Sequence, residues 1–463
     1  MFKLYCYKHF YTIHTTVGFN LFNIEYLILL VFILVLALST LLTLYSKLKT
    51  NTFSLSIPVW IMLLWLFKGG VDFSIAEIAG VDLRYESELF PIKVDLDYLL
   101  AYLTYFLYFL SYCTVCILYF ISSKKVSGEF VNVDFLRSKF NLKPLFLLST
   151  VTVVLYLYYG INMYRESLGS GLSIYHYSRF NGGTSKSLMT LISWIGLASC
   201  ILGIGIATKR NRIIFIFLLL SIFLISGILG NRHILLSGMI LYFVLFLDTK
   251  KYSILSFLKM VAVFVLILSS IMSIYVVREA QEGDFDSVNP EKVQTSIVNM
   301  FSSSEFIYSH MSMYGVYSNE IEVSVGKSLF FLVSATLPRV ISNDREEDIY
   351  NYYIQQVSSN PFKGFTIANP TGWYLNFGIV GVFFGGCILG LICCSLHFCC
   401  YHNRKQSMFF ILVFSLFLSD IIGYMRSGGP EPLRAVLLIK AILPAIIIIT
   451  VMKFKFRFRM RPR

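Results

Sequence analysis

The stretch from Tyr98 to Ile121 is 24 residues long and contains no charged side chain. A helix needs about 20 predominantly apolar residues to cross a bilayer, so this stretch alone predicts a membrane protein. The composition extends the argument to the whole chain, which is 56% hydrophobic and only 14% charged. Soluble chains carry about 25% charged residues. A soluble enzyme, a disordered chain and a nucleic-acid-binding protein are therefore excluded.

Further apolar runs along the chain resemble this first one. The sequence predicts an all-α polytopic integral membrane protein with about eleven transmembrane helices, within a range of ten to twelve. Two of the runs are read as a hairpin, because one helix of their combined length would exceed the thickness of the bilayer. The predicted helices are 26–45, 53–67, 98–121, 144–160, 187–208, the hairpin pair 213–229 and 233–247, 254–277, 371–400, 407–425 and 435–452.

The uneven distribution of lysine and arginine predicts the orientation. If the basic tail 453–463 is cytoplasmic, the inner connections hold 21 Lys/Arg and 3 Asp/Glu in 64 residues. The outer connections hold 17 Lys/Arg and 22 Asp/Glu in 186 residues. Basic residues gather in cytoplasmic loops, so the net charge of +13 is a topology signal and requires no acidic partner. The same count places the N-terminus outside.

One outer connection, 278–370, is far longer than the others, at 93 residues. Loops of this length are usually functional or disordered, and its many aromatic residues argue against disorder. Within it, 327–339 is apolar but too short to span, which predicts a re-entrant or interfacial helix. We therefore expect a helical bundle over 1–277, a large outer loop domain over 278–370, and C-terminal helices with a basic tail over 371–463.

Nine cysteines are present, and only Cys6 is predicted to lie outside. No disulfide framework can therefore form in the long outer loop. The run from Cys393 to His402 could supply part of a tetrahedral zinc site. A helix end rich in soft apolar residues explains the same run more simply. We predict neither a metal nor a cofactor.

Five arginines are predicted at one level of the bilayer, at its outer edge. A guanidinium presents a planar fork of donors that suits phosphate oxygens, so together they could hold a diphosphate at headgroup level. Each could instead reach lipid phosphates, or pair with Glu279, Asp344 or Glu431. The five are Arg232, Arg278, Arg339, Arg426 and Arg434.

Two charged residues, Asp420 and Lys440, lie inside predicted helices. Each is about 8 Å from the outer end of its helix, at about 1.5 Å per residue. Charges at such positions are rare and are generally paired or functional. An ion pair between these consecutive helices is the first expectation, and a role in orienting the arginines is the second.

Three motifs resemble the Wzy-type oligosaccharide repeat-unit polymerases, the O-antigen polymerases of bacterial inner membranes. They are Gly230-Asn-Arg-His-Ile-Leu-Leu236, Asn369-Pro-Thr-Gly-Trp-Tyr-Leu-Asn-Phe-Gly-Ile-Val-Gly381 and Gly423-Tyr-Met-Arg-Ser-Gly-Gly429. The plan of about eleven helices with one large outer loop late in the chain is similar too. The resemblance implies a metal-independent, GT-C-like glycosyltransferase that joins repeat units carried on undecaprenyl diphosphate at the periplasmic face. The family's important arginines would correspond to Arg232 and Arg426, and less directly to Arg278 and Arg434.

The implied reaction separates charge. A sugar hydroxyl of one lipid-linked unit would attack the anomeric carbon of another, and lipid diphosphate would leave. Cations fixed beside the leaving oxygen are the most direct contribution a protein can make, which assigns catalysis to Arg232, Arg278 and Arg426. Arg339 and Arg434 would help to bind the diphosphate.

Other candidates would contact the sugars. A general base near the acceptor hydroxyl is optional, and His310, Glu305 and Glu320 lie in the right compartment. The simpler interpretation of each is an ordinary polar loop residue. Aromatic side chains could stack on sugar faces or anchor the chain at the membrane interface. The aromatic candidates are Trp373, Tyr352 and Tyr353.

Rival functions stay open. An O-antigen ligase uses the same donor but transfers the glycan to lipid A–core. A lipid-linked-oligosaccharide flippase or other transporter would favour internal repeats and charges near the bilayer midplane, and neither is visible. A non-catalytic scaffold is a further alternative. The expected partners are undecaprenyl-diphosphate-linked oligosaccharide and the bilayer, with a chain-length regulator conceivable and no nucleic acid. The expected location is the bacterial inner membrane, with a cytoplasmic C-terminus and a site facing the periplasm.

Overall fold

The computed structural model describes residues 24–78, 94–122, 141–170, 183–229, 233–248, 305–326, 348–357, 366–401 and 407–453, together with 329 and 331. Within these ranges the chain is almost entirely helical and contains no β-strand. Eight of the described helices are long and apolar enough to cross a membrane, and 233–247 and 408–419 are shorter apolar helices. The predicted all-α, membrane-type architecture is confirmed at this level.

The described residues account for every predicted span except 254–277, which lies outside them. Three stretches, η2, η3 and η4, are π-helical turns continuous with α-helix. The elements of the spans are α2 (Ile24–Thr50); η1 (Ser54–Ser56), α3 (Ile57–Met62), η2 (Leu63–Phe67) and α4 (Lys68–Ile78); α5 (Leu96–Ser122); α7 (Leu142–Ser170); α9 (Gly183–Ile206); α10 (Lys209–Ile228); α11 (His233–Tyr242) and η3 (Phe243–Leu247); α17 (Asn369–Tyr401); α18 (Met408–Ser419) and α19 (Ile421–Met425); and α20 (Pro432–Arg434), η4 (Ala435–Ile442) and α21 (Leu443–Lys453).

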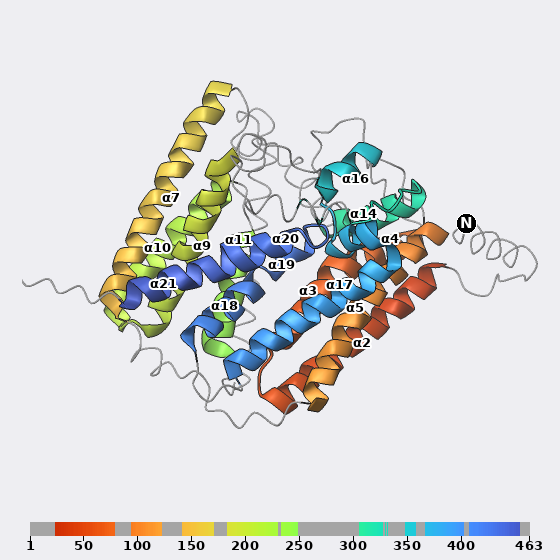
Figure 1. Cartoon of the computed structure of the whole chain (residues 1–463), viewed down its shortest axis with the longest axis horizontal. Coiled ribbons are helices and arrows are strands. Elements are labelled where there is room, and N and C mark those ends of the chain that lie inside the picture. The colour runs from red at the N-terminus through yellow and green to blue at the C-terminus, as the bar shows by residue number, and fades with distance from the viewer. Residues whose placement is uncertain are drawn as a thin grey trace, which may run out of the picture.

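These helices form two groups that α18 connects (Figure 1). In the first group α17 packs along α5, and α2 packs against α4 and α5. In the second group α7, α9 and α10 pack on one another, and α11 and α21 pack against α9. Helix α18 contacts α17 of the first group and α11 of the second. The segment that follows α18 therefore begins between the two groups.

Helix α5 is fixed to its neighbours by tyrosines along one face. Their spacing of three or four residues places them in one stripe, and all five are 0% exposed. Three of the hydroxyls donate to the backbone oxygens of Gly70, Phe67 and Leu55, which lie in the irregular run from η1 to α4. A buried hydroxyl without a partner is costly, so these bonds fix the register of α5 against that run. The five are Tyr98, Tyr102, Tyr105, Tyr108 and Tyr112.

Helix α17 is broken near its start. Gly378 has φ +63° and ψ −153°, a conformation that glycine adopts at little cost. The break frees backbone oxygens of the preceding turn, and residues of the long outer connection bond to them. Ser324 N–H donates to Leu375 O at 2.7 Å, and Gly326 N–H donates to Asn376 O at 2.9 Å. The short helical segment 369–377 is therefore set apart from the rest of α17 and is held at both ends.

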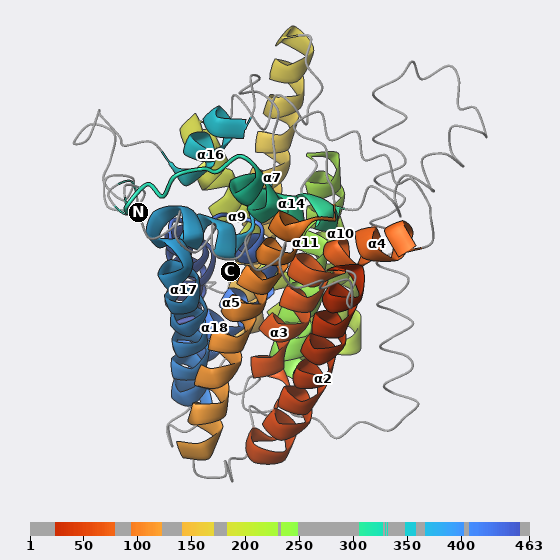
Figure 2. The same cartoon turned by 90° about the vertical axis from the view of Figure 1, so that its right-hand side faces the viewer.

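The long outer connection packs onto the helices where it is described. Helix α14 (Glu305–Ser318) lies across one end of the first group and contacts α4 and α5 (Figure 2). The same end carries α16 (Ile349–Val357), so we name it the predicted outer end. Of the predicted re-entrant helix 327–339, only residues 329 and 331 are described, and that prediction stays open.

Candidate functional site

The second and third resemblance motifs meet at the predicted outer end. The Asn369 side chain is 0% exposed, and its amide nitrogen donates to the backbone oxygens of Tyr424, Ser427 and Gly429. The Asn369 amide oxygen accepts a bond of 2.9 Å from the Tyr108 hydroxyl. One side chain therefore ties the turn after α19 to α5. Buried polar networks of this kind are rigid when each member is satisfied.

Arg426 stands on the turn that Asn369 holds. Its backbone N–H closes α19 on Ile422 O at 3.1 Å, and its side chain is half-buried. The guanidinium carbon lies over the Trp65 ring, 5.6 Å from the centroid. An aromatic face attracts a guanidinium and can stack on it. Backbone and side chain of Arg426 are thus both restrained.

The first motif approaches the same place through its last described part. Residues 230–232 are not described, but His233 begins α11. Helix α11 contacts α19 directly. The elements that carry the three motifs therefore meet beside Arg426.

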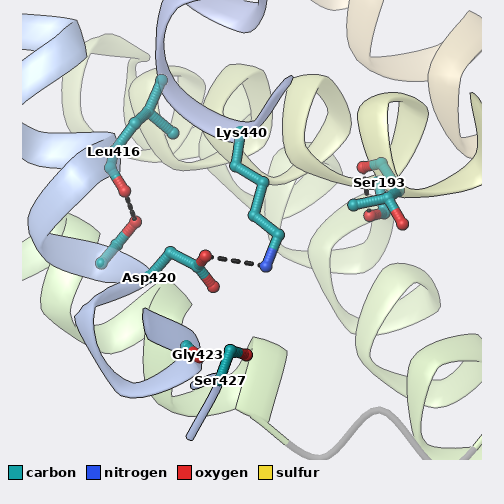
Figure 3. A network of polar contacts seen from close by, with 8 residues as sticks. Ser193, Leu416, Asp420, Gly423, Ser427 and Lys440 are labelled. Carbon is teal, nitrogen blue, oxygen red and sulfur yellow. Dashed lines mark hydrogen bonds and ion pairs between the residues drawn. The ribbon is translucent and has the colours of Figure 1, made fainter. Parts of the chain in front are cut away.

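Asp420 and Lys440 form the predicted ion pair, which the structure confirms (Figure 3). Lys440 Nζ lies 2.7 Å from Asp420 Oδ2, and the Asp420 side chain is 0% exposed. Asp420 sits at the break between α18 and α19. The absence of a side chain at Gly423 leaves room for the carboxylate, because a Cβ there would lie 2.7 Å from Asp420 Oδ1. Lys440 also lies over the Trp194 ring of α9, at 5.7 Å.

Four further candidates, one arginine and three aromatic residues, are described in the structure. Arg434 is half-buried at the end of α20, on the segment that follows Arg426. Trp373 and Tyr353 are buried, at 5% and 1% exposure, and this packing favours a structural role over sugar stacking. Tyr352 is half-buried, and its hydroxyl donates to Glu322 O at 2.9 Å.

His310, a candidate base, lies inside the protein at 0% exposure. Its ring packs against the rings of Tyr98, Tyr102 and Tyr105 at centroid distances of 4.7, 5.6 and 5.6 Å. Burial lowers the pKa of His310 to about 4. The neutral ring is enclosed between α14 and the tyrosines of α5 and does not reach a surface. This favours a role in packing α14 onto α5 over a role in proton transfer.

Several predicted residues cannot be placed. Arg232, Arg278 and Arg339 fall outside the described residues, so a shared site of five arginines stays a prediction. Glu305 begins α14, but its side chain is not described. Glu320, by contrast, is described: it is exposed, two residues after the end of that helix, with φ +49°.

A second polar network lies at the opposite end of the helices. The buried Asp248 carboxylate accepts the backbone N–H of Phe53, and the Tyr401 hydroxyl donates to it at 3.4 Å. Nearby, the two ring nitrogens of His397 lie 3.0 Å from Thr52 Oγ1 and 2.9 Å from the Tyr119 hydroxyl. His397 belongs to the cysteine- and histidine-rich run, and hydrogen bonds to side chains occupy both of its nitrogens.

Sequence reasoning missed Trp65 and Tyr108 at the candidate site. Both lie within apolar runs and look like ordinary membrane-helix aromatics, because nothing local marks their partners. The contact of Tyr108 with Asn369 joins residues 261 positions apart. Asn369 belongs to one of the three motifs, but the motif does not indicate which backbone oxygens its side chain bonds to.

The arrangement places the Arg426 guanidinium on a rigid turn and over the Trp65 ring. The Asp420–Lys440 ion pair lies nearby, with Lys440 over the Trp194 ring. No family model matches this chain, and neither a curated protein nor a solved structure matches it. The family resemblance therefore depends on the three motifs and on the way their residues meet.

Proposed function

We propose that the chain is a GT-C-like glycosyltransferase that polymerises oligosaccharide repeat units carried on undecaprenyl diphosphate, building O-antigen or a similar surface polysaccharide. It would work at the periplasmic face of a bacterial inner membrane. The proposal is supported chiefly by one observation: Arg426 stands on a turn fixed by Asn369, where the elements that carry the three resemblance motifs meet.

A fixed guanidinium suits this chemistry because the charge that develops is on a leaving diphosphate. The acceptor hydroxyl oxygen forms a bond to the anomeric carbon while the bond from that carbon to the diphosphate oxygen breaks. The hydroxyl proton passes to water or to the released diphosphate, so no base from the protein is required. Preorganised donors at the leaving oxygen stabilise the transition state more than the ground state. Arg426 carries this role, and Arg232 and Arg278 would complete the site.

The Asp420–Lys440 pair supports the site from behind. A charge pair at this position neutralises the buried carboxylate and links α19 to η4. Because Lys440 is already held at 2.7 Å by Asp420, we assign it a structural role. We assign the contact with the diphosphate to Arg426.

The test is complementation of a deletion strain with Arg426→Ala and Arg426→Lys at matched protein levels. The surface glycan is then separated by size. Arg426→Ala should collapse long chains to single repeats, and Arg426→Lys should rescue only partly, because an ammonium cannot make a forked contact. Arg210→Ala is the matched control, since Arg210 is exposed at the opposite end. Long chains from Arg426→Ala would refute the role of Arg426.

The deletion strain also separates the rival functions. Loss of a polymerase leaves a single repeat unit attached to its acceptor. Loss of a ligase leaves no attached unit, and loss of a flippase leaves lipid-linked units facing the cytoplasm. Only the first result agrees with the proposal.

A further inference from the structure

Val325 lies in the long outer connection, and its backbone is strained. Its φ is +49°, in the left-handed region that a β-branched residue adopts only at a cost. The residues on either side of it hold this conformation in place. Ser324 N–H and Gly326 N–H donate to the two backbone oxygens that the break in α17 frees. The strained residue therefore sits at the tip of a turn that is bonded to the start of α17.

The turn directs an apolar side chain away from the protein interior. Val325 is 80% exposed, whereas Ser324 and Gly326 beside it are buried. Phe377 lies next to the turn, because a Cβ on Gly326 would be 3.1 Å from its ring, and Phe377 is itself 38% exposed. Apolar residues that are exposed singly need no explanation. A strained backbone that exposes a valine beside an exposed phenylalanine does need one.

The exposed apolar face of α17 leads to the same place. Ile379 and Phe398 are 19 positions apart, which corresponds to about 28 Å of helix at about 1.5 Å per residue. This length is close to the thickness of a bilayer hydrocarbon core, about 30 Å. The face therefore has the length of the core, with Ile379 at one edge of it and Val325 and Phe377 directly beyond. Its exposed apolar residues include Ile379, Val380, Phe384, Leu391 and Phe398.

Charged residues in the sequence agree with this placement. Arg404 and Lys405 follow the far end of α17, where basic residues mark the inner edge of the membrane. At the near end, the outer connection carries Glu320 and Glu322, which are both exposed. Within five positions the connection thus passes from exposed carboxylates to an exposed valine. Such a change suits a chain that enters the bilayer surface from water.

We propose that Val325 anchors the long outer connection in the membrane, by inserting among lipid acyl chains at the outer end of α17. Lipid fits this surface better than a protein partner, because the surface continues an apolar face as long as the bilayer core. Removal of the valine side chain from water would offset the strain in its backbone. The anchor would set the height of segment 369–377 relative to the lipid headgroups. It goes beyond the proposed function and does not depend on it.

The experiment measures how deep Val325 lies, with a thiol-reactive bimane probe on Val325→Cys in full-length protein in phosphatidylcholine liposomes. Three quenchers are compared: a lipid nitroxide near the headgroup end of the acyl chain, one near its methyl end, and iodide in the water. The shallow nitroxide should quench most, and the two nitroxides together should place the probe about 15 Å from the bilayer centre, half of the core thickness. Leu391→Cys should respond most to the deep nitroxide and Glu320→Cys most to iodide. Wild-type protein treated in parallel gives the background from native cysteines.

Two results of this measurement would overturn the inference. Quenching of the Val325→Cys probe chiefly by iodide would place the residue in water. Protection from all three quenchers would mean that another protein segment, or a second copy of the chain, covers it.

A second arm tests whether the contact holds the connection in place. Asparagine tolerates the left-handed backbone, so Val325→Asn removes the apolar side chain without adding strain. The probe is now on Leu329→Cys, since Leu329 is exposed and its N–H closes the turn on Gly326 O at 2.9 Å. Iodide should quench this probe more strongly in the Val325→Asn protein than in the protein that retains Val325. Equal quenching in the two proteins would show that Val325 is no anchor. If Val325→Cys fails to accumulate, this comparison decides alone.

Discussion

Gly372 lies directly against the backbone of Gly429. A Cβ on Gly372 would be 2.1 Å from the Gly429 nitrogen and 2.2 Å from the Gly428 carbonyl carbon. The obstructing atoms are backbone, which cannot turn aside as a side chain can. Two motifs far apart in the sequence therefore touch only because both are glycine at the contact, and the position of Arg426 depends on that closeness.

Gly372→Ala should separate these two backbones. Overpacking of this kind costs about 1–3 kcal/mol, so we expect a lower midpoint of thermal unfolding and a loss of long glycan chains. Gly169→Ala is the control, because a Cβ on Gly169 meets no atom within 4 Å. Unchanged activity in Gly372→Ala would mean that the two motifs need not be in contact.

The Asp420–Lys440 pair should show strong coupling. Removing one partner of a buried pair costs about 3–5 kcal/mol, whereas replacing both partners with apolar residues is often nearly neutral. Lys440→Met should be the more damaging single change, because Asp420 is 0% exposed and its side chain would lose its cation, while Lys440 is 17% exposed. The double variant Asp420→Leu/Lys440→Met should recover much of the thermal midpoint. Additive losses would contradict the pairing.

The apolar cores of the spans were predictable, but several helix ends were not. The predicted span 53–67 continues as helix to Ile78, where Lys68 and Asp72 form an i,i+4 ion pair. The predicted span 144–160 likewise continues to Ser170 through Arg165 and Glu166. Apolarity reports where a helix crosses the bilayer. It does not report where the backbone hydrogen bonding stops, so charged extensions were missed.

The candidate site divides in the same way. Asp420, Lys440 and Arg426 were predictable because a charge in or beside an apolar run is conspicuous. The supports of Arg426 were not, because Trp65 resembles any aromatic residue in a membrane helix. The burial of His310 was missed for a related reason. Its partners are three tyrosines on α5, about 200 positions earlier, and no local pattern connects them.

The orientation predicts the outcome of reporter fusions. A fusion after residue 208, between α9 and α10, should place the reporter in the cytoplasm. A fusion after residue 170, at the end of α7, should place it outside. The physical reason is the concentration of lysine and arginine in the inner connections. Alkaline phosphatase should be active only in the second fusion and green fluorescent protein fluorescent only in the first. The opposite pattern would invert the membrane topology.

Asp248 should make stability fall as pH rises. Burial raises the pKa of Asp248 to about 6, while the hydrogen bond from the backbone of Phe53 opposes the shift. Its unfolded value is about 3.8, so the folded state binds more protons between these pH values. Stability is therefore greatest below about pH 4 and declines by about 3 kcal/mol up to pH 6. Asp248→Asn should gain thermal midpoint relative to the wild type over that window. A constant difference between the two proteins would contradict burial of the charge.

His310 should have the opposite effect in nearly the same window. Burial lowers its folded pKa to about 4 from an ordinary 6.5, so the unfolded chain binds more protons between these values. Stability is full above about pH 6.5 and is lost as pH falls toward 4, by about 3 kcal/mol. The two slopes oppose each other between pH 4 and 6, and their contributions to the wild-type profile should nearly cancel. His310→Phe removes one slope while keeping an aromatic ring among Tyr98, Tyr102 and Tyr105. Its thermal midpoint relative to the wild type should therefore rise as the buffer is made more acidic, from pH 7 to pH 4.5. A midpoint difference that does not change with pH would show that the His310 ring is solvated, and that the tyrosines of α5 do not enclose it.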